Sequence, residues 1–203
     1  MNYKPLRALL AVVSLCALTH AVQAQQRGGL DSLSLIQPGG AGADAVWQLF
    51  APEGAGFSLL VPGTPEEMTR RGREAGTLAP QFRSYHLTAA DGLKYEFGRT
   101  GQLPAQVTGQ PGFNDKFWAT NAQGLMLALQ SENRAAKFEL VAERKIAVAG
   151  YEGREYEFAA PGLRSLARVY LVNRAIFALA VSGRESALTD DKANKFLDSF
   201  SAN

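Results

Sequence analysis

Residues 166–182 read LARVYLVNRAIFALAVS, and this segment determines the architecture of the chain. It contains two runs of strand-forming residues, 166–172 and 175–182, which are separated only by Asn173 and Arg174. A connection of two residues joins antiparallel strands, because parallel neighbours need a crossover of about a dozen residues or more. The segment therefore predicts an antiparallel hairpin.

The short connection also predicts the register of this hairpin. Residues that lie directly opposite each other are found by counting away from the turn, and they share one face of the sheet. The expected pairs are Val172 with Ala175, Tyr170 with Phe177, and Arg168 with Leu179. Both strands carry apolar residues on both of their sides, which is typical of strands that are covered on each face.

Similar strand patterns recur along the rest of the chain. They cover residues 46–50, 57–61, 82–88, 93–98, 138–148 and 153–159, with Gly- and Pro-containing turns between most of them. A charged stretch, 66–74, is expected to form a solvated strand or loop, although its arginines could contact an anion. The longest segment without periodicity is 101–112, and we expect any specific contact to lie there.

A helix is predicted in the middle of the chain. Phe117 and Leu125 are separated by a multiple of four residues within an apolar stripe, which predicts a helix over 115–135 with Asn114 as its cap. Trp118 lies beside this stripe. It could line a hydrophobic ligand pocket, or it could belong to the core face of the helix.

A second helix is predicted near the end of the chain. Thr189 is expected to cap it, and its apolar positions are Ala193, Phe196, Leu197 and Phe200. A meander of strands with one helix in the middle and one at the end cannot form a doubly wound parallel sheet. The predicted fold class is α+β, an antiparallel β-sheet flanked by helices on both faces in an α/β/α sandwich.

The first 24 residues have the layout of a secretory signal peptide. Lys4 and Arg7 precede an apolar run, and the segment ends in Val22-Gln23-Ala24, whose small residues suit signal peptidase. A membrane anchor is the alternative, but a span needs about 20 apolar residues and this run is interrupted too early. We therefore expect export to the periplasm or the medium. Residues 25–44 are expected to be a flexible leader, and 45–203 the folded domain.

Composition and charge exclude several classes of function. The chain has 203 residues and a formal charge of +2, which is not the balance of a polybasic nucleic-acid-binding protein. Loss of the signal leaves 21 − 2 = 19 basic residues against 19 acidic ones. Cys16 and His20 leave with it, so His86 is the only histidine of the mature chain and no cysteine is left. Disulfides, thiolate nucleophiles and multi-histidine zinc sites are therefore excluded, and we expect no metal and no cofactor.

Few residues of the mature chain are candidates for chemistry. His86 could act as a base, but no partner for it is near in sequence, so a hydrogen-bonded strand histidine is the simpler interpretation. Glu155 and Glu157 share one strand face and could serve glycoside chemistry or bind a cation. We name no catalytic residue.

The candidate binding residues are Arg168, Tyr170 and Trp118. Arg168 lies on a strand face that is otherwise apolar and shares it with Tyr170, so it needs a partner. That partner could be an anionic ligand. The simpler interpretation is a structural pair with Glu155 or Glu157, or stacking on the ring of Tyr156, because buried charges are usually paired within the protein.

Four segments resemble motifs of the PsbP-like family, in particular its exported bacterial members. They are FSLLVPGTP at 57–65, GYEGREY at 150–156, RVYLVNR at 168–174 and KFLDSF at 195–200, and the resemblance spans 47–200. It implies an antiparallel sheet between helices and a role as a binding or assembly module. Relatives include extrinsic photosystem II subunits and a eukaryotic Ran-binding protein, while many bacterial members have no assigned activity. None of their functional residues carries over to this chain.

Three functions remain open on this basis. The first is an exported, non-enzymatic module that binds a protein or another envelope component through 101–112 or an exposed sheet edge. The second is a carrier of a small molecule or lipid, with a pocket between the sheet and the helix over 115–135. The third is a hydrolase that uses carboxylate, Ser or Lys chemistry.

Overall fold

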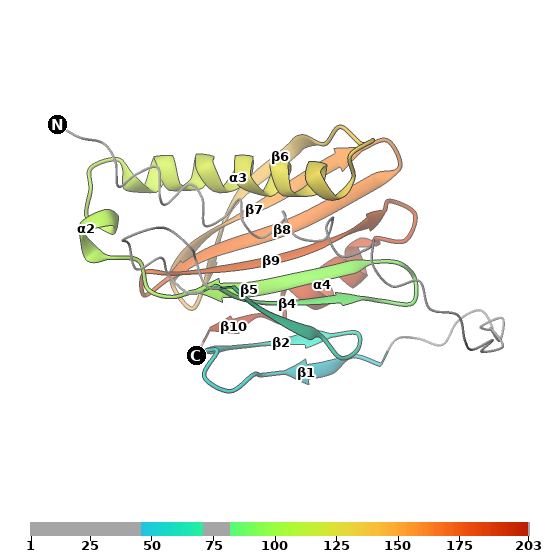
Figure 1. Ribbon diagram of the computed structural model, residues 1–203, viewed down its shortest axis with the longest axis horizontal. Helices are drawn as coiled ribbons and strands as arrows, with labels where there is room; N and C mark the ends of the chain where they lie inside the picture. The colour runs from blue at the N-terminus through green and yellow to red at the C-terminus, as the bar shows by residue number, and fades with distance from the viewer. Residues whose placement is uncertain (1–45, 71–81, 203) are drawn as a thin grey trace, which may run out of the picture.

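The computed structural model describes residues 46–70 and 82–202, and its main element is a seven-stranded sheet (Figure 1). The strand order is β3-β4-β5-β9-β8-β7-β6, and every neighbouring pair is antiparallel. The strands are β3 (Glu66–Arg70), β4 (Phe82–Thr88), β5 (Lys94–Thr100), β6 (Glu139–Val148), β7 (Tyr151–Ala160), β8 (Leu163–Val172) and β9 (Ala175–Arg184). The antiparallel sheet predicted from the sequence is confirmed.

The hairpin of β8 and β9 has the register that its two-residue turn predicts. Val172 lies opposite Ala175, Tyr170 opposite Phe177, and Arg168 opposite Leu179. Asn173 and Arg174 both adopt positive φ angles, 47° and 66°. These signs match the mirror-image turn that suits the twist of the flanking strands.

A second, three-stranded sheet has the order β1-β2-β10. Its strands are β1 (Gln48–Phe50), β2 (Phe57–Val61) and β10 (Ser201–Ala202). The antiparallel pairing of the first two strands was expected, but their separation into another sheet was not. The reason lies in β2, where alternate residues are buried against the aromatic face of the large sheet.

The described residues contain three helices, α2 (Ala105–Thr108), α3 (Phe113–Glu132) and α4 (Asp190–Leu197). Thr189 caps α4 as expected, because its side chain accepts from the Lys192 backbone N–H. For α3 the expected cap, Asn114, is wrong, since the helix begins earlier and Gly112 is the cap in a left-handed conformation. None of these helices is long and apolar enough to cross a membrane.

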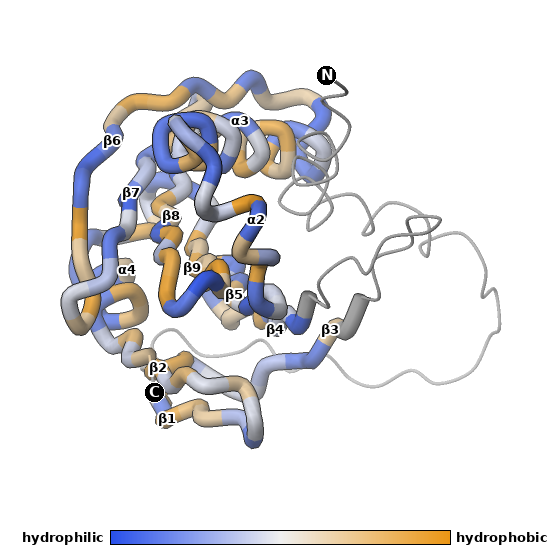
Figure 2. Tube along the Cα trace, turned by 90° about the vertical axis from the view of Figure 1, so that its left-hand side faces the viewer, coloured by the Kyte–Doolittle hydropathy of each residue, from blue (hydrophilic) through white to orange (hydrophobic). Residues whose placement is uncertain are grey.

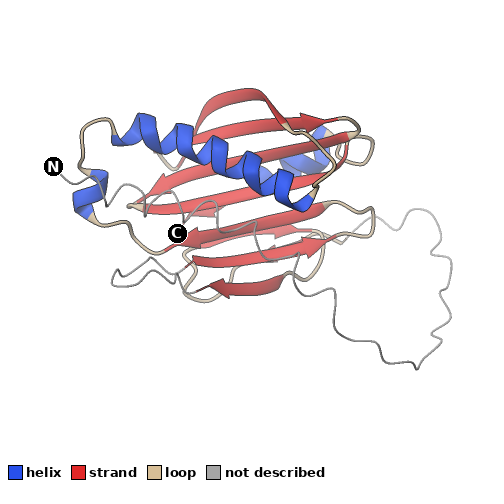
Figure 3. Ribbon diagram, turned by 45° about the horizontal axis from the view of Figure 1, so that its top comes forward, coloured by secondary structure: helices blue, strands red, loops and turns tan. Residues whose placement is uncertain are grey.

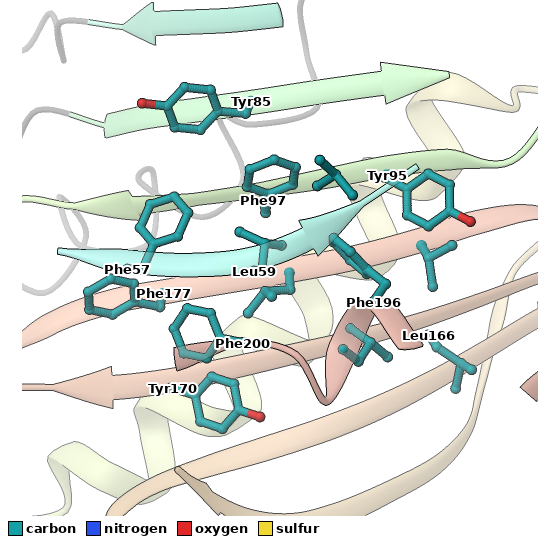
Figure 4. Close-up of a cluster of buried hydrophobic side chains, with 14 of the residues drawn as sticks. Phe57, Leu59, Tyr85, Tyr95, Phe97, Leu166, Tyr170, Phe177, Phe196 and Phe200 are labelled. Carbon is teal, nitrogen blue, oxygen red and sulfur yellow. The ribbon is translucent and has the colours of Figure 1, made fainter. Parts of the chain in front are cut away.

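Two hydrophobic clusters hold the layers together. Adjacent residues of one strand belong to different clusters, as Ile176 and Phe177 do, because side chains alternate along a strand. The first cluster is rich in aromatic residues and joins the sheet to β2 and α4 (Figure 4). The second joins the sheet to α3. In Figure 3 this helix crosses the strands of the large sheet at an angle.

The expected sandwich with a helix layer on each face is not confirmed in that form. In Figure 2, α3 lies above β7, β8 and β9, and β6 curves around it, while β1 and β2 lie below the large sheet. The face that contacts α4 is thus shared with a second small sheet. A largely antiparallel α+β architecture is what the structure shows.

Candidate binding surface

Arg168 in β8 is held by two carboxylates. Its side chain is 12% exposed, and its Nε lies 2.7 Å from Oε2 of Glu155, the residue directly opposite in β7. Its Nη1 lies 2.6 Å from Oδ1 of Asp198, which follows α4. Glu155 is one of the partners that the sequence analysis left open for Arg168, whereas it did not predict Asp198.

Glu155 is the centre of this group. Its side chain is 7% exposed and also accepts hydrogen bonds from Arg144 of β6, so that Arg144, Glu155 and Arg168 form one row across three strands. Burial by itself would raise the pKa of the Glu155 carboxyl, but the hydrogen bonds from Arg144 and Arg168 outweigh it and lower the pKa. The two arginines therefore favour the ionised form of Glu155.

The neighbouring carboxylate, Glu157, is engaged in a separate pair. Its Oε1 lies 2.7 Å from Nε of Arg164, whose Nη1 contacts Asp190 at the start of α4, also at 2.7 Å. The hydrogen bonds that Arg164 donates to both acids raise its pKa, and the bond to Asp190 contributes most. Glu155 and Glu157 thus contact arginines in separate ion pairs.

Tyr170 is a core residue. Its ring is stacked on Phe200 at a centroid distance of 5.2 Å, and it covers Gly153 in the neighbouring strand. A Cβ atom at Gly153 would lie 2.5 Å from Cδ1 of this ring, so the glycine provides the space that the tyrosine fills. Burial raises the pKa of Tyr170.

Trp118 lies in the other cluster, with α3. The guanidinium of Arg154 sits 4.9 Å from the centre of its ring, and the hydroxyl of Tyr156 donates to its carbonyl oxygen at 3.1 Å. Arg154 is itself paired with Glu143 and Glu152. Trp118 therefore belongs to a cluster on the opposite side of the sheet from Arg168 and Tyr170, and the three candidates do not form one site.

His86 is a strand residue of β4. Its Nε2 lies 3.3 Å from Oε2 of Glu66, the residue opposite it in β3. Within residues 46–70 and 82–202, no group of three His, Cys, Asp or Glu side chains could hold a metal ion. The arrangement at His86 is a cross-strand contact between a partly buried imidazole and an exposed glutamate.

The segment 101–112 was expected to lack regular structure, but it contains the short helix α2. Leu103 anchors it: its side chain is fully buried, and its N–H donates to the Arg174 carbonyl oxygen at 2.8 Å. Arg174 also donates from Nη2 to Oε1 of Gln102 at 3.2 Å. Most residues from Pro104 to Gly112 are exposed, so this segment presents side chains from a fixed backbone.

Two tight turns lie at the same end of the sheet as this segment. They are 149–150 between β6 and β7, and 173–174 between β8 and β9, and the Tyr151 hydroxyl links them by donating to Asn173 Oδ1 at 3.1 Å. We call residues 101–112, 149–150 and 173–174 the loop end. The non-glycine residues with positive φ in the described chain, Ala149, Asn173 and Arg174, are all there. Positive φ at these positions is what the two-residue turns of twisted hairpins require.

One comparison with known proteins supports the fold, and none gives a function. No family model matches the chain, and no curated protein matches it. Among solved structures, cyanobacterial PsbP (CyanoP) from Synechocystis sp. PCC 6803 is similar, with a TM-score of 0.51 and 15% identity over 83% of this chain and 99% of that one. A protein of unknown function from Pseudomonas aeruginosa has a TM-score of 0.38 and 14% identity, over 74% of this chain and 95% of that one. The chain thus has a PsbP-like fold.

Proposed function

We propose that this protein is an exported, non-enzymatic binding or assembly module, and that it contacts a protein or another envelope component through the loop end. One observation carries the proposal: the exposed residues of 101–112 are displayed on a backbone that is anchored by Leu103 and by Arg174. A preorganised surface loses little conformational entropy on binding. A helix layer over each face of the large sheet is part of the same proposal.

The state of the ionisable groups supports a non-enzymatic role. Glu155 and Arg168 are committed to each other, and Glu157 is committed to Arg164. A general acid or base needs a pKa near the working pH, whereas the pKa of Glu155 is shifted downward, away from it.

The contact through the loop end can be tested by site-specific photo-crosslinking in cells that produce the full chain. A photoreactive residue at Gln106, which is exposed in α2, should capture a defined partner. The matched control is Gln123, an exposed glutamine of α3. Capture of the same products from both positions, or none from Gln106, contradicts the proposal. Deletion of 101–112 is a poorer test because it removes the buried Leu103.

Export is tested separately by N-terminal sequencing of the mature protein. Cleavage after Ala24 predicts Gln25 as the first residue. An intact Met1 in the envelope fraction would contradict a cleaved signal.

A carrier is the second candidate function, and one observation favours it. The indole N–H of Trp118 and the amide oxygen of Asn121 are buried between α3 and the sheet, without a hydrogen-bond partner among the described residues. Buried polar groups of this kind usually have a partner. Binding of an apolar fluorescent probe that Trp118→Phe weakens more than Trp47→Phe would favour the carrier over the assembly module.

A further inference from the structure

Two arginines lie directly opposite each other in the hairpin of β4 and β5. Arg83 and Arg99 are cross-strand partners, and alternation places both on the face that carries Tyr85 and Phe97. Like charges in directly opposite positions destabilise a sheet. The repulsion between the two positive charges must therefore be offset, either by acidic groups of the protein or by a bound anion.

The internal compensation is incomplete. Arg83 donates from Nη1 to the Glu53 carbonyl oxygen at 3.0 Å, and its Nε lies 3.0 Å from Oε1 of Glu67, in a pair of which both members are about 40% exposed. Arg99 donates to the carbonyl oxygens of Ala55 at 2.7 Å and Thr100 at 3.4 Å. Arg83 thus has one exposed carboxylate partner, and exposed pairs of this kind are weak.

Arg99 differs from the other half-buried arginines of the large sheet. Arg154, Arg164 and Arg168 each contact two carboxylates. Within the described residues, Arg99 contacts backbone carbonyls and the ring of Phe177, 5.6 Å away, but no carboxylate. Its remaining N–H groups have no acidic partner among residues 46–70 and 82–202.

Tyr85 supplies a further donor beside this pair. The residue is 2% exposed, and its hydroxyl has no hydrogen bond of normal geometry within the described chain. In Figure 4 the hydroxyl points toward the start of β4, which is the side of Arg83. Burial raises the pKa of Tyr85 and the charge of Arg83 opposes this, so the phenol remains a neutral donor.

We propose that Arg83 and Arg99, with the Tyr85 hydroxyl at the buried end, form an oxyanion site that receives a carboxylate of the partner protein. The planar fork of a guanidinium matches a carboxylate in a bidentate way. This inference rests on the proposed function, because β5 leads from Arg99 directly into 101–112, so the site adjoins the loop end.

The test is a titration of the isotopically labelled mature protein with a six-residue glutamate peptide, followed by the Nε–H signals of its arginines. The signals of Arg83 and Arg99 should shift and saturate. Arg99→Gln should weaken binding about tenfold, as expected for loss of a charge-assisted contact. Tyr85→Phe should weaken it about threefold, because one neutral hydrogen bond is lost.

Two variants keep this test decisive. Arg134→Gln removes the same charge from an exposed position after α3 and should leave binding unchanged. Arg99→Lys keeps the charge without the planar fork, so it should weaken binding several-fold even if Arg99→Gln does not fold. Equal effects of Arg134→Gln and Arg99→Gln, or no saturable shift at Arg99, overturn the proposal. The proposal is also overturned if inorganic phosphate, or vesicles containing phosphatidylglycerol, bind more tightly than the glutamate peptide.

The same variants separate this site from the proposed function. Loss of peptide binding with continued crosslinking from Gln106 removes the oxyanion site and leaves the loop end in place. Peptide binding without crosslinking from Gln106 supports the oxyanion site and contradicts contact through the loop end.

Discussion

Two strand pairs of the same sheet differ in the residue that lies opposite an arginine. Between β7 and β8, Arg168 lies opposite Glu155, and each neutralises the other in a largely buried contact. Between β4 and β5, Arg99 lies opposite Arg83, and Arg83 alone of the two contacts a carboxylate among the described residues, namely Glu67. In these two pairs, the residue across the strand from the arginine is a carboxylate in one case and a second arginine in the other. The predictions below test this difference.

Removing the charge at the centre of the first pair should have the largest effect. Glu155→Gln leaves Arg168 largely buried with only Asp198 beside it, and breaking a buried ion pair costs about 3 kcal/mol. Arg99→Gln should cost about 1 kcal/mol, because it removes hydrogen bonds to the turn at Ala55. Urea denaturation measures both losses.

The matched control for this comparison is Glu157→Gln. Its pair with Arg164 is more exposed, so the loss should stay below about 1 kcal/mol. Equal losses at Glu155 and Glu157 would show that burial of the first pair does not matter.

Acid should act on the same group by protonation. The pKa of Glu155 is lower in the folded protein than its ordinary value of 4.5, so its contribution to stability is complete above that value. It is lost as the pH falls through the lower, folded pKa. The melting temperature of the wild type should therefore fall more steeply below about pH 4.5 than that of Glu155→Gln. Asp91 shifts in the same direction, which makes the difference between the two proteins the quantity to measure.

Each strand pair also contains a glycine at a close approach. A Cβ atom at Gly98 would meet the backbone of β4, 2.8 Å from Cα of Ser84, whereas one at Gly153 would meet the ring of Tyr170. A ring can shift more easily than a strand backbone. Gly98→Ala should therefore cost about 2 kcal/mol, and Gly153→Ala about 1 kcal/mol. The reverse order in urea denaturation would contradict the packing described for Tyr170.

The sequence predicts one of these pairs better than the other for a physical reason. Because two residues connect β8 and β9, the register of Arg168 follows from counting. The hairpin of β4 and β5 was predicted, but its longer loop leaves several registers open, so the opposition of Arg83 and Arg99 was missed. Counting from Thr88 opposite Lys94 would have found it.

Other contacts could not be predicted because they depend on tertiary packing. Asp198 reaches Arg168 only because α4 packs on β8, and no local pattern encodes that distance. β10 is two residues long, which is too short for any periodicity to be recognised. The anchored backbone of 101–112 depends on Arg174, a residue more than sixty positions further along the chain.

The smallest expected effects concern the two turns of the loop end. Arg174→Gly should stabilise the protein by about 0.5 kcal/mol, because a non-glycine residue at positive φ costs about 1 kcal/mol and glycine adds unfolded-state entropy. Ala149→Gly relieves a similar strain at φ 47°. Only Arg174 also holds Gln102 through its side chain. A smaller gain for Arg174→Gly than for Ala149→Gly would therefore measure how firmly the arginine holds the 101–112 segment, whereas equal gains would leave Leu103 as its main anchor.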